Sequence, residues 1–385
     1  MILRFVYFAL MGMAFFPSIY YVIVLYSSWQ FFRRSGGSSQ PENTSYTPPV
    51  SNLKPVRGLD PEAYENFASF CRQDYPEYEI VFCVGDTSDP AYPTLEKLTR
   101  DFPECQIRIL IGSGRIAPND KVAKLSRLTA EAKYETLVIT DSDVRVRPDY
   151  LRSVVAPMRD PKVGAVTCMY ISHCDATFTQ RLQSIGMISD FYPGILVARQ
   201  LDGVKFALGQ TIVTTRRHVQ GFGGYETIEN RPGDDLLVGR MIEEQGFEVV
   251  LFPRPVETVA DFQSMGELLT KRLRWMTVMR HMRPMGHLGL VFTQGLLWAI
   301  VAVSLHPTIP AALLYFGLYF ALRISVTMSV GAWGLHQKDL WKQLPLIPVW
   351  DLTASLIWLL SFTRRSITWR KVRYRIREGM LVPVR

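Results

Sequence analysis

Short apolar runs alternate with amphipathic segments between residues 50 and 262, which is the pattern of strands and helices taken in turn. The runs rich in β-branched residues are expected to be strands, at 50–54, 79–84, 106–111, 137–140, 163–169 and 248–252. Helices are expected between them, at 61–71, 92–100, 119–133 and 235–245. This alternation predicts an α/β domain with a mostly parallel sheet covered on both faces.

Apolar segments of membrane length flank this region. Residues 5–26 are nearly all apolar, and at ~1.5 Å per residue they match a bilayer core of ~30 Å. No small-residue cleavage site is evident, so we interpret them as a retained anchor. Residues 265–285 form a cation-rich amphipathic segment, which is typical of a helix in the membrane interface. Three apolar stretches follow, at 288–305, 309–330 and 344–362.

The third apolar stretch is expected to be an incomplete span. It contains two prolines and Asp351, an ionisable residue that is costly at membrane depth. Arg33 and Arg34 follow the anchor and place the middle domain on the cytoplasmic face by the positive-inside rule. If all three later stretches crossed the membrane, the basic C-terminal residues would end outside, against the same rule.

These patterns predict an integral membrane protein with six regions. They are an anchor at 1–30, a linker at 31–49, an α/β domain at 50–262, an interfacial helix at 263–287, membrane helices at 288–363 and a basic tail at 364–385. The mean hydropathy of +0.07 therefore averages apolar ends with a middle of ordinary composition.

Charge and cysteine content indicate which surface the chain contacts and which redox compartment it occupies. Of 385 residues with a formal net charge of +8, many of the cations lie in the tail at 364–385. A basic segment beside apolar helices favours an anionic membrane surface over nucleic acid. The five cysteines are an odd number without a CxxC motif, so we expect buried thiols in a reducing compartment: Cys71, Cys83, Cys105, Cys168 and Cys174.

Two carboxylates follow the expected strand at 137–140. Asp141 and Asp143 are separated by a single serine, at the strand end where open α/β sheets bind ligands. Ionised Asp offers only acceptor oxygens, which suit Mg²⁺ or Mn²⁺ shared with a diphosphate. Asp-Ser-Asp is also common in solvated turns, so the motif alone leaves both interpretations open.

Three further positions carry candidate chemistry, and each has a simpler alternative. Asp86 follows the strand at 79–84 and is also compatible with a plain turn. Asp234 and Asp235 open an expected helix, where adjacent carboxylates also serve as caps. Arg274 and Trp275 lie on the amphipathic segment, where they would equally anchor it in the interface.

The ordered set of an early Asp, a DxD, a later Asp pair and an RW motif resembles glycosyltransferases that use nucleotide sugars on a Rossmann-like GT-A fold. It resembles most the membrane-bound ceramide glucosyltransferases and their bacterial relatives, including enzymes that glycosylate hopanoid lipids. The resembling segments are LKPVRGLD (53–60), DYPEYEIVFCVGDTSDPA (74–91), NDKVAKL (119–125), TDSDVRV (140–146), GVKFALG (203–209), GGYE (223–226) and ITWRKVRYRI (367–376). One departure is Lys271 at the first position of the (Q/R)xxRW pattern, which keeps the charge without the planar guanidinium.

The resemblance implies an inverting transfer of glucose or N-acetylglucosamine from a UDP-sugar to the hydroxyl of a membrane lipid, and a Mg²⁺ or Mn²⁺ cofactor. Asp235 would be the general base, in a single displacement without a protein nucleophile. The implied roles are donor binding by Lys54, Asp86, Asp141 and Arg274, metal binding by Asp143 and Asp141, and catalysis by Asp235, Asp234, Arg274 and Trp275.

Two other functions are compatible with these motifs. A processive polysaccharide synthase shares them, but needs enough spanning helices for a polymer channel, and this chain has few. An inactive membrane scaffold that binds a nucleotide sugar or another subunit is the second alternative, and the intact Asp and Arg positions argue against such decay. Glucose on ceramide and N-acetylglucosamine on a hopanoid polyol both remain open.

Overall fold

The computed structural model describes residues 1–36, 45–173, 176–259, 264–369 and 372–384. The chain divides into two compact units. We call Gly37–Cys174, Asp202–Asp261 and Tyr374–Arg385 the sheet unit, and Met1–Gly36, Asp175–Leu201 and Phe262–Arg373 the helical unit. Part of the predicted linker, the predicted boundary at 262–263, Cys174, Arg370, Lys371 and Arg385 lie outside the described residues.

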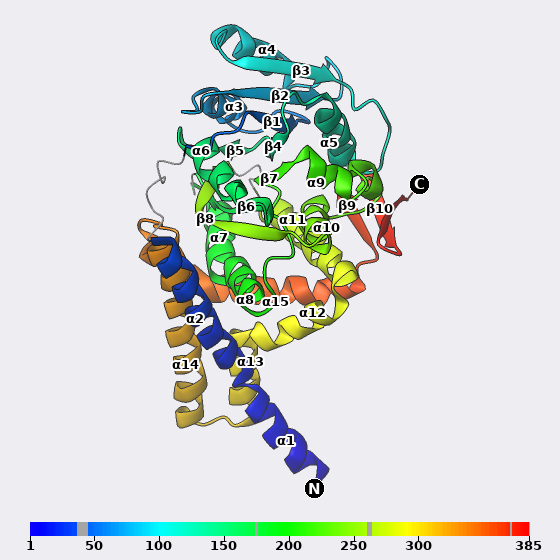
Figure 1. Cartoon of the computed structure of the whole chain (residues 1–385). Helices are drawn as coiled ribbons and strands as arrows, with labels where there is room; N and C mark the ends of the chain where they lie inside the picture. The colour runs from blue at the N-terminus through cyan, green and yellow to red at the C-terminus, as the bar shows by residue number, and fades with distance from the viewer. Residues whose placement is uncertain (37–44, 174–175, 260–263, 370–371, 385) are drawn as a thin grey trace. The chain divides into compact units, whose positions relative to one another are not determined.

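An eight-stranded sheet forms the core of the sheet unit (Figure 1). Its strands, in spatial order, are β3 (Gln106–Ile111), β2 (Tyr78–Val84), β1 (Val50–Pro55), β4 (Thr136–Ile139), β7 (Ile212–Thr215), β6 (Val163–Ser172), β8 (Glu248–Thr258) and β5 (Val144–Arg145). The first four run parallel, whereas β7 is antiparallel to both its neighbours, β4 and β6. The α/β fold is confirmed, and the antiparallel β7 is an element that the sequence pattern did not indicate.

Helices and short helical turns connect the strands. They are α3 (Ala63–Cys71), α4 (Tyr92–Asp101), α5 (Asp120–Glu131), α6 (Tyr150–Val155), η1 (Ala156–Arg159), α9 (Arg216–Gly221), η3 (Tyr225–Ile228) and α10 (Asp234–Glu244). The strands β1 and β4 are buried along their whole length, because both faces of a central parallel strand are covered. Cys71, Cys83 and Cys168 are buried free thiols, as expected, whereas Cys105 is only half-buried.

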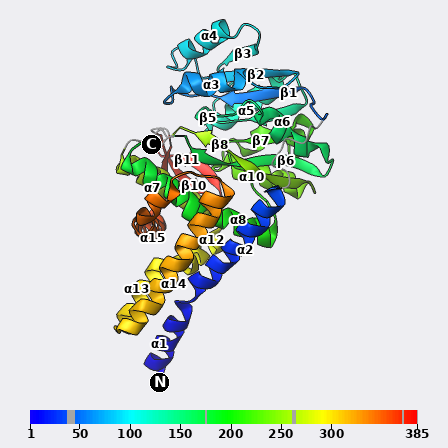
Figure 2. The same cartoon turned by 90° about the vertical axis from the view of Figure 1, so that its left-hand side faces the viewer.

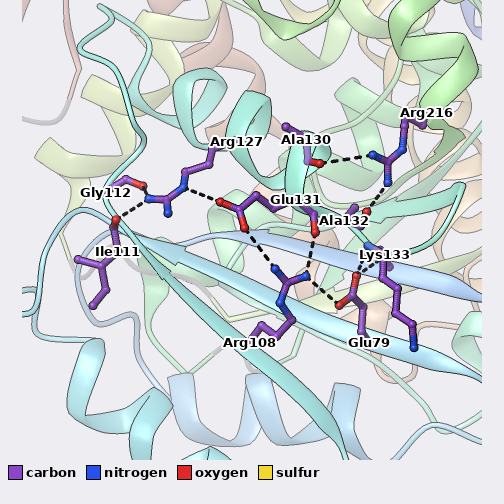
Figure 3. Close-up of polar contacts among 11 residues, drawn as sticks. Glu79, Arg108, Ile111, Gly112, Arg127, Ala130, Glu131, Ala132, Lys133 and Arg216 are labelled. Atoms are coloured by element: carbon purple, nitrogen blue, oxygen red, sulfur yellow. Dashed lines mark hydrogen bonds and ion pairs between the residues drawn. The ribbon is translucent and has the colours of Figure 1, made fainter.

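A network of charged side chains fastens the C-terminal end of α5 to the sheet (Figure 3). Glu79 is 1% exposed, and its carboxylate accepts hydrogen bonds from the Ser51 hydroxyl and the Lys133 N–H, each at 2.6 Å. Arg108 bridges this carboxylate at 3.3 Å and the Glu131 backbone carbonyl at 2.8 Å. Arg127 donates to the backbone carbonyls of residues 111 and 112. The C-terminal end of α5 is therefore held to the sheet by hydrogen bonds to backbone groups and a buried carboxylate.

The segment predicted as a basic tail folds into strands. A hairpin of β10 (Val372–Arg377) and β11 (Met380–Pro383) belongs mostly to the sheet unit. The Tyr374 hydroxyl donates to the carbonyl of Pro118 at 3.1 Å, and the Leu381 N–H donates to the carbonyl of Asn230 at 2.7 Å. Since β-strand side chains alternate, Tyr374 and Ile376 are buried while the arginines between and beside them are exposed.

The helical unit contains the segments predicted to meet the membrane. Its elements are α1 (Ile2–Met13), α2 (Phe16–Gly36), α7 (Phe178–Gly186), η2 (Met187–Phe191), α8 (Tyr192–Asp202), α11 (Met265–Met282), α12 (Pro284–Gly289), η4 (Leu290–Thr293), α13 (Gly295–Leu305), α14 (Ile309–Thr327), η5 (Met328–Gly334), η6 (Leu340–Leu346), α15 (Ile347–Thr363) and β9 (Ser366–Trp369). Among the described residues, three continuous helical segments are long and apolar enough to cross a membrane: Arg4–Arg34, Ile309–Gly334 and Leu340–Thr363. The pair Pro284–Thr293 and Gly295–Leu305 is bent by 57°, as in a broken span or a re-entrant loop.

The third apolar stretch, expected to be an incomplete span because of its prolines and Asp351, lies in one continuous helical segment, Leu340–Thr363. Pro345 is inside η6 and Pro348 is in the first turn of α15, where proline is tolerated, so α15 itself is unbroken. In both views, however, α15 runs crosswise to α2 and α14 (Figures 1 and 2). An incomplete span of this segment stays a prediction. The single helix expected at 263–287 is interrupted at Arg283, since a residue before proline disfavours helical geometry.

Asp351, which looks isolated in the apolar sequence, has close partners. The Arg323 Nε and the Tyr319 hydroxyl each lie 2.9 Å from its Oδ2. The Arg323 guanidinium also donates to the backbone carbonyl of Ser189. This buried ion pair joins α14, α15 and η2, so that each charge in an apolar environment is compensated.

Candidate functional site

Three predicted site residues meet at the ends of β4 and α10 in the sheet unit. Asp141 follows β4, and Asp234 and Asp235 form the first turn of α10. The ammonium group of Lys121, from the first turn of α5, lies 2.6 Å from Asp141 Oδ1 and 3.3 Å from Asp234 Oδ2. The side chains of Lys121, Asp141 and Asp234 are 15%, 28% and 12% exposed. The cluster is therefore largely shielded from solvent.

Gly209 brings a backbone N–H into this cluster. It donates to Asp235 Oδ2 at 3.1 Å, while Asp235 Oδ1 accepts from the N–H of Leu236 at 2.9 Å. A Cβ on Gly209 would lie 3.2 Å from the Lys121 ammonium and 3.3 Å from Asp141 Oδ2. Such contacts are tight, so the missing side chain lets the backbone approach the charged groups.

The electrostatics of the cluster set Asp235 apart from ordinary carboxylates. Burial, together with the charge of Asp234, raises the pKa of Asp235 to about 6. Burial would lower the pKa of Lys121, but the carboxylates of Asp141, Asp234 and Asp235 outweigh it and raise that pKa above its ordinary value. A shielded carboxylate with a pKa near neutrality is suited to accept a proton during a reaction.

Lys54 lies behind the Asp-Ser-Asp motif. It is fully buried on β1, and its ammonium group donates to the backbone carbonyl of Asp141 at 3.3 Å. The same group lies 3.4 Å from the ring centroid of Phe70. Burial lowers the pKa of Lys54 to about 7, against the opposing charges of Asp141 and Asp143. These contacts fix the backbone that presents Asp141.

Asp143 and Asp86 lie beyond the ends of β4 and β2. The backbone carbonyl of Asp143 accepts from the N–H of Val259 at 3.0 Å, just before the short strand β5. Asp86 is exposed after β2, and its carboxylate accepts from the Ser88 N–H at 2.7 Å and from the Ser88 hydroxyl, which holds its pKa below the usual value. Asp89, which is not one of the predicted site residues, accepts a hydrogen bond from the Gly58 N–H at 3.0 Å. This bond ties the loop after β1 to the loop after β2.

The carboxylates are chemically compatible with a divalent cation. Among the described residues, no group of three or more His, Cys, Asp or Glu side chains forms a complete metal site. Mg²⁺ typically binds one or two carboxylates and takes its other ligands from water and substrate phosphates. Asp141 and Asp143 offer two carboxylates after β4, which is the number that such a site requires.

Arg274 and Trp275 lie on α11, in the helical unit, whereas the carboxylates belong to the sheet unit. The most buried cation on α11 is Arg272, whose Nε donates to Gln183 Oε1 at 2.7 Å. Its guanidinium carbon lies 5.0 Å from the ring centroid of Trp275 and 4.8 Å from that of Trp350. Arg272 thus orients Trp275 through cation–π contacts.

Arg272 is not among the site residues predicted from the sequence motifs, because it lies between Lys271 and Arg274 of the (Q/R)xxRW pattern. The available signal was its i, i+3 spacing from Trp275, which puts both side chains on one helix face.

The comparisons with known proteins identify the family of the chain. Residues 9–382 match the profile of Glycosyl transferase family 21. The chain belongs to this family. A family 21 protein is a glycosyltransferase, so the predicted enzyme class and the suspected family are confirmed.

Relatives in the sequence comparison are ceramide glucosyltransferases, and a solved structure shares the fold. Ceramide glucosyltransferase 3 of Caenorhabditis elegans is 23% identical over 389 residues, covering 94% of this chain and 79% of the relative. Ceramide glucosyltransferase of Komagataella phaffii is 35% identical over 158 residues, covering 39% of this chain and 31% of the relative. A mannosyltransferase from Pyrobaculum calidifontis, solved with GDP-Man and Mn²⁺, shares the fold with a TM-score of 0.54 and 19% identity, covering 89% of this chain and 99% of that one.

Proposed function

We propose that this glycosyltransferase moves a hexose, glucose or N-acetylglucosamine, from a UDP-sugar to the hydroxyl of a membrane lipid such as ceramide or a hopanoid, with inversion at the anomeric carbon. The observation that carries the proposal is the shielded cluster of Asp141, Asp234, Asp235 and Lys121 at the strand ends. Membership of family 21 and relatives named ceramide glucosyltransferases support the lipid acceptor.

Asp235 is the proposed general base. Its carboxylate is held in a fixed orientation by the N–H groups of Gly209 and Leu236, and its raised pKa matches the task of taking the acceptor's proton. As that proton leaves, the acceptor oxygen attacks the anomeric carbon and the bond to the diphosphate breaks. With one base and no protein nucleophile, the reaction is a single displacement, which inverts the configuration.

Asp141 and Asp143 are proposed to hold Mg²⁺ or Mn²⁺, which would stabilise the charge on the departing diphosphate. The Mn²⁺ bound with GDP-Man in the structurally similar mannosyltransferase supports this cofactor. Lys54, predicted to bind the donor, is fully buried against Asp141 and Phe70, so we propose that it supports the Asp141 backbone instead. The exposed carboxylate of Asp86 is proposed to accept a hydrogen bond from the uracil N–H or a ribose hydroxyl. Arg274 is proposed to bind the diphosphate and Trp275 to border the acceptor.

The membrane is proposed as the source of the acceptor. The apolar helices of the helical unit are long enough to cross a bilayer, and the arginines after the anchor favour a cytoplasmic catalytic unit.

The test is an assay of the full chain in detergent with UDP-glucose and UDP-N-acetylglucosamine, each against ceramide and a hopanoid polyol. Formation of a glycolipid whose anomeric configuration is opposite to that of the donor is expected. Retained configuration would overturn the single displacement. Polymer in place of a single-sugar lipid would favour the processive synthase. Nucleotide-sugar binding without turnover of any acceptor would favour the scaffold.

A further inference from the structure

Lys121 has close carboxylate partners that all belong to the proposed reaction site. Its ammonium lies 2.6 Å from Asp141 Oδ1 and 3.3 Å from Asp234 Oδ2, beneath the backbone of Gly209. Asp141 is also a proposed metal ligand. One ammonium group therefore lies against an oxygen that a divalent cation would use.

Lys124, one turn further along α5, has structural contacts and serves as a comparison for Lys121. Lys124 is 2% exposed, and its ammonium donates to the backbone carbonyl of Val56 at 2.8 Å and to Asp120 at 3.0 Å. Those contacts join α5 to the loop after β1 and involve no proposed site residue. The contacts of Lys121 are instead with Asp141 and Asp234, both at the site.

Electrostatics decides which partner the Lys121 ammonium keeps when a cation arrives. Like charges a few ångströms apart in a shielded site repel strongly, so an ammonium bound to Asp141 weakens the binding of a metal ion alone. A diphosphate brought with the metal adds negative charge that the ammonium can bind instead. The lysine stem is flexible and its ammonium has three donors, which suits such a change of partner.

We propose that Lys121 neutralises Asp141 and Asp234 in the donor-free enzyme and moves to the donor's diphosphate on binding, so that metal and nucleotide bind together rather than separately. This inference rests on the proposed function, because it takes the donor to be a nucleoside diphosphate sugar and Asp141 to be a metal ligand. Lys121 would then contact the donor directly, as a site residue absent from the motif-based set.

The experiment compares Mn²⁺ affinity with and without UDP in the full chain in detergent, by titration calorimetry. In the wild type, UDP should raise Mn²⁺ affinity at least about tenfold, a typical coupling between linked ligands. Lys121→Met should bind Mn²⁺ alone at least about tenfold more tightly than the wild type, and UDP should then raise that affinity less. Its KM for the donor should increase. Lys121→Arg keeps the charge and should bind Mn²⁺ alone as the wild type does.

Lys205→Met is the matched control, since Lys205 pairs with Asp202 and Glu243 away from the cluster. It should leave both affinities unchanged. Unchanged or weaker binding of Mn²⁺ alone by a folded Lys121→Met, as judged by thermal unfolding, would overturn the proposal. The metal-only titration does not require UDP to be the right nucleotide. UDP could leave the Mn²⁺ affinity of both the wild type and Lys121→Met unchanged while the two proteins differ in Mn²⁺ affinity. In that case the donor assignment fails and the role of Lys121 at Asp141 stands.

Discussion

The two ends of α5 both carry clustered charges, but the clusters differ in their partners. At the C-terminal end, Arg108 and Arg127 bind backbone carbonyls as well as carboxylates, and the buried Glu79 accepts hydrogen bonds from several donors (Figure 3). At the N-terminal end, the Lys121 ammonium binds two carboxylates, which it is proposed to exchange for the donor's diphosphate.

The difference shows how one helix serves two purposes. A guanidinium that bridges fixed backbone groups holds a helix against a sheet, because its planar donors match several acceptors at once. An ammonium bound only to side chains gives a site in which charge can be exchanged. Substitutions at the C-terminal end of α5 should therefore change stability, and substitutions of Lys121 and its partners at the N-terminal end should change activity.

The largest effect should come from Asp143→Ala. Removing a carboxylate proposed to hold the metal should abolish transfer and weaken Mn²⁺-dependent binding of UDP, because the diphosphate loses its counter-charge. Binding is measured by calorimetry with and without Mn²⁺, and Asp160→Ala, at an exposed turn, is the control. A folded Asp143→Ala with the wild-type metal-dependent affinity would show that the metal lies elsewhere.

Asp235→Asn should slow transfer at least ~10²-fold, the usual scale of general-base catalysis. The substitution is nearly isosteric, so thermal stability and donor affinity should stay close to those of the wild type. Asp234→Asn is the matched comparison and should lose less activity, because it lies beside the proposed base. The reverse order of damage would move the base to Asp234.

Glu79→Ala tests the opposite end of α5. It removes a buried acceptor of the Ser51 hydroxyl, the Lys133 N–H and Arg108, and should cost about 3 kcal/mol of unfolding free energy. The remaining folded enzyme should keep its kcat. The two quantities are measured by denaturant unfolding and by single-turnover assays below the unfolding midpoint. A loss of kcat at unchanged stability would contradict the division between the two ends.

The pH dependence should follow Asp235. A base works only when it is ionised, and the pKa of Asp235 is raised to about 6 by burial and by Asp234. The value of kcat/KM should therefore be constant above that pH and fall about tenfold for each further unit of acidity. A pH profile of kcat/KM from about two units below that pKa to about two units above it checks this. In Asp235→Asn, the residual rate should lack this acidic limb.

Glu131→Gln should have the smallest effect. Its side chain is 40% exposed, and it pairs with Arg127 and Arg108 at the surface, so the loss should be within about 0.5 kcal/mol. Arg108 keeps its hydrogen bond to the Glu131 backbone carbonyl in this variant. Chemical denaturation beside Glu79→Ala measures the difference. A loss as large as that of Glu79→Ala would show that the exposed pair, rather than the buried carboxylate, fixes this end.

Local pattern predicted the first four strands and their helices, because each is a short apolar run followed by an amphipathic segment. It did not indicate β7, since the pairing of Ile212–Thr215 between β4 and β6 depends on contacts distant in sequence. The C-terminal hairpin resembles a basic tail in the sequence because its arginines hide the alternation of buried Tyr374, Ile376 and Leu381.

The residues of the candidate site likewise differ in whether local sequence could predict them. Asp141 and the Asp234–Asp235 pair could be found because carboxylates at a strand end and a helix start form recognisable motifs. Lys121 lies in a segment that carries the family resemblance, but nothing local shows which distant carboxylate a lysine will reach. The sequence signal for Arg272 was its i, i+3 spacing from Trp275, but its partners Gln183 and Trp350 come from segments far away in the sequence and could not be predicted locally.

The return of β10 and β11 to the sheet unit has a consequence for how the protein is synthesised. The hairpin contacts Pro118 and Asn230, which lie shortly before Lys121 and Asp234 in the chain. The ribosome makes these two strands only after the apolar helices of the helical unit. The loops beside the proposed reaction site therefore gain this support only after the apolar helices have been synthesised. We expect a nascent chain stalled before residue 372 to be inactive although its site residues are already made.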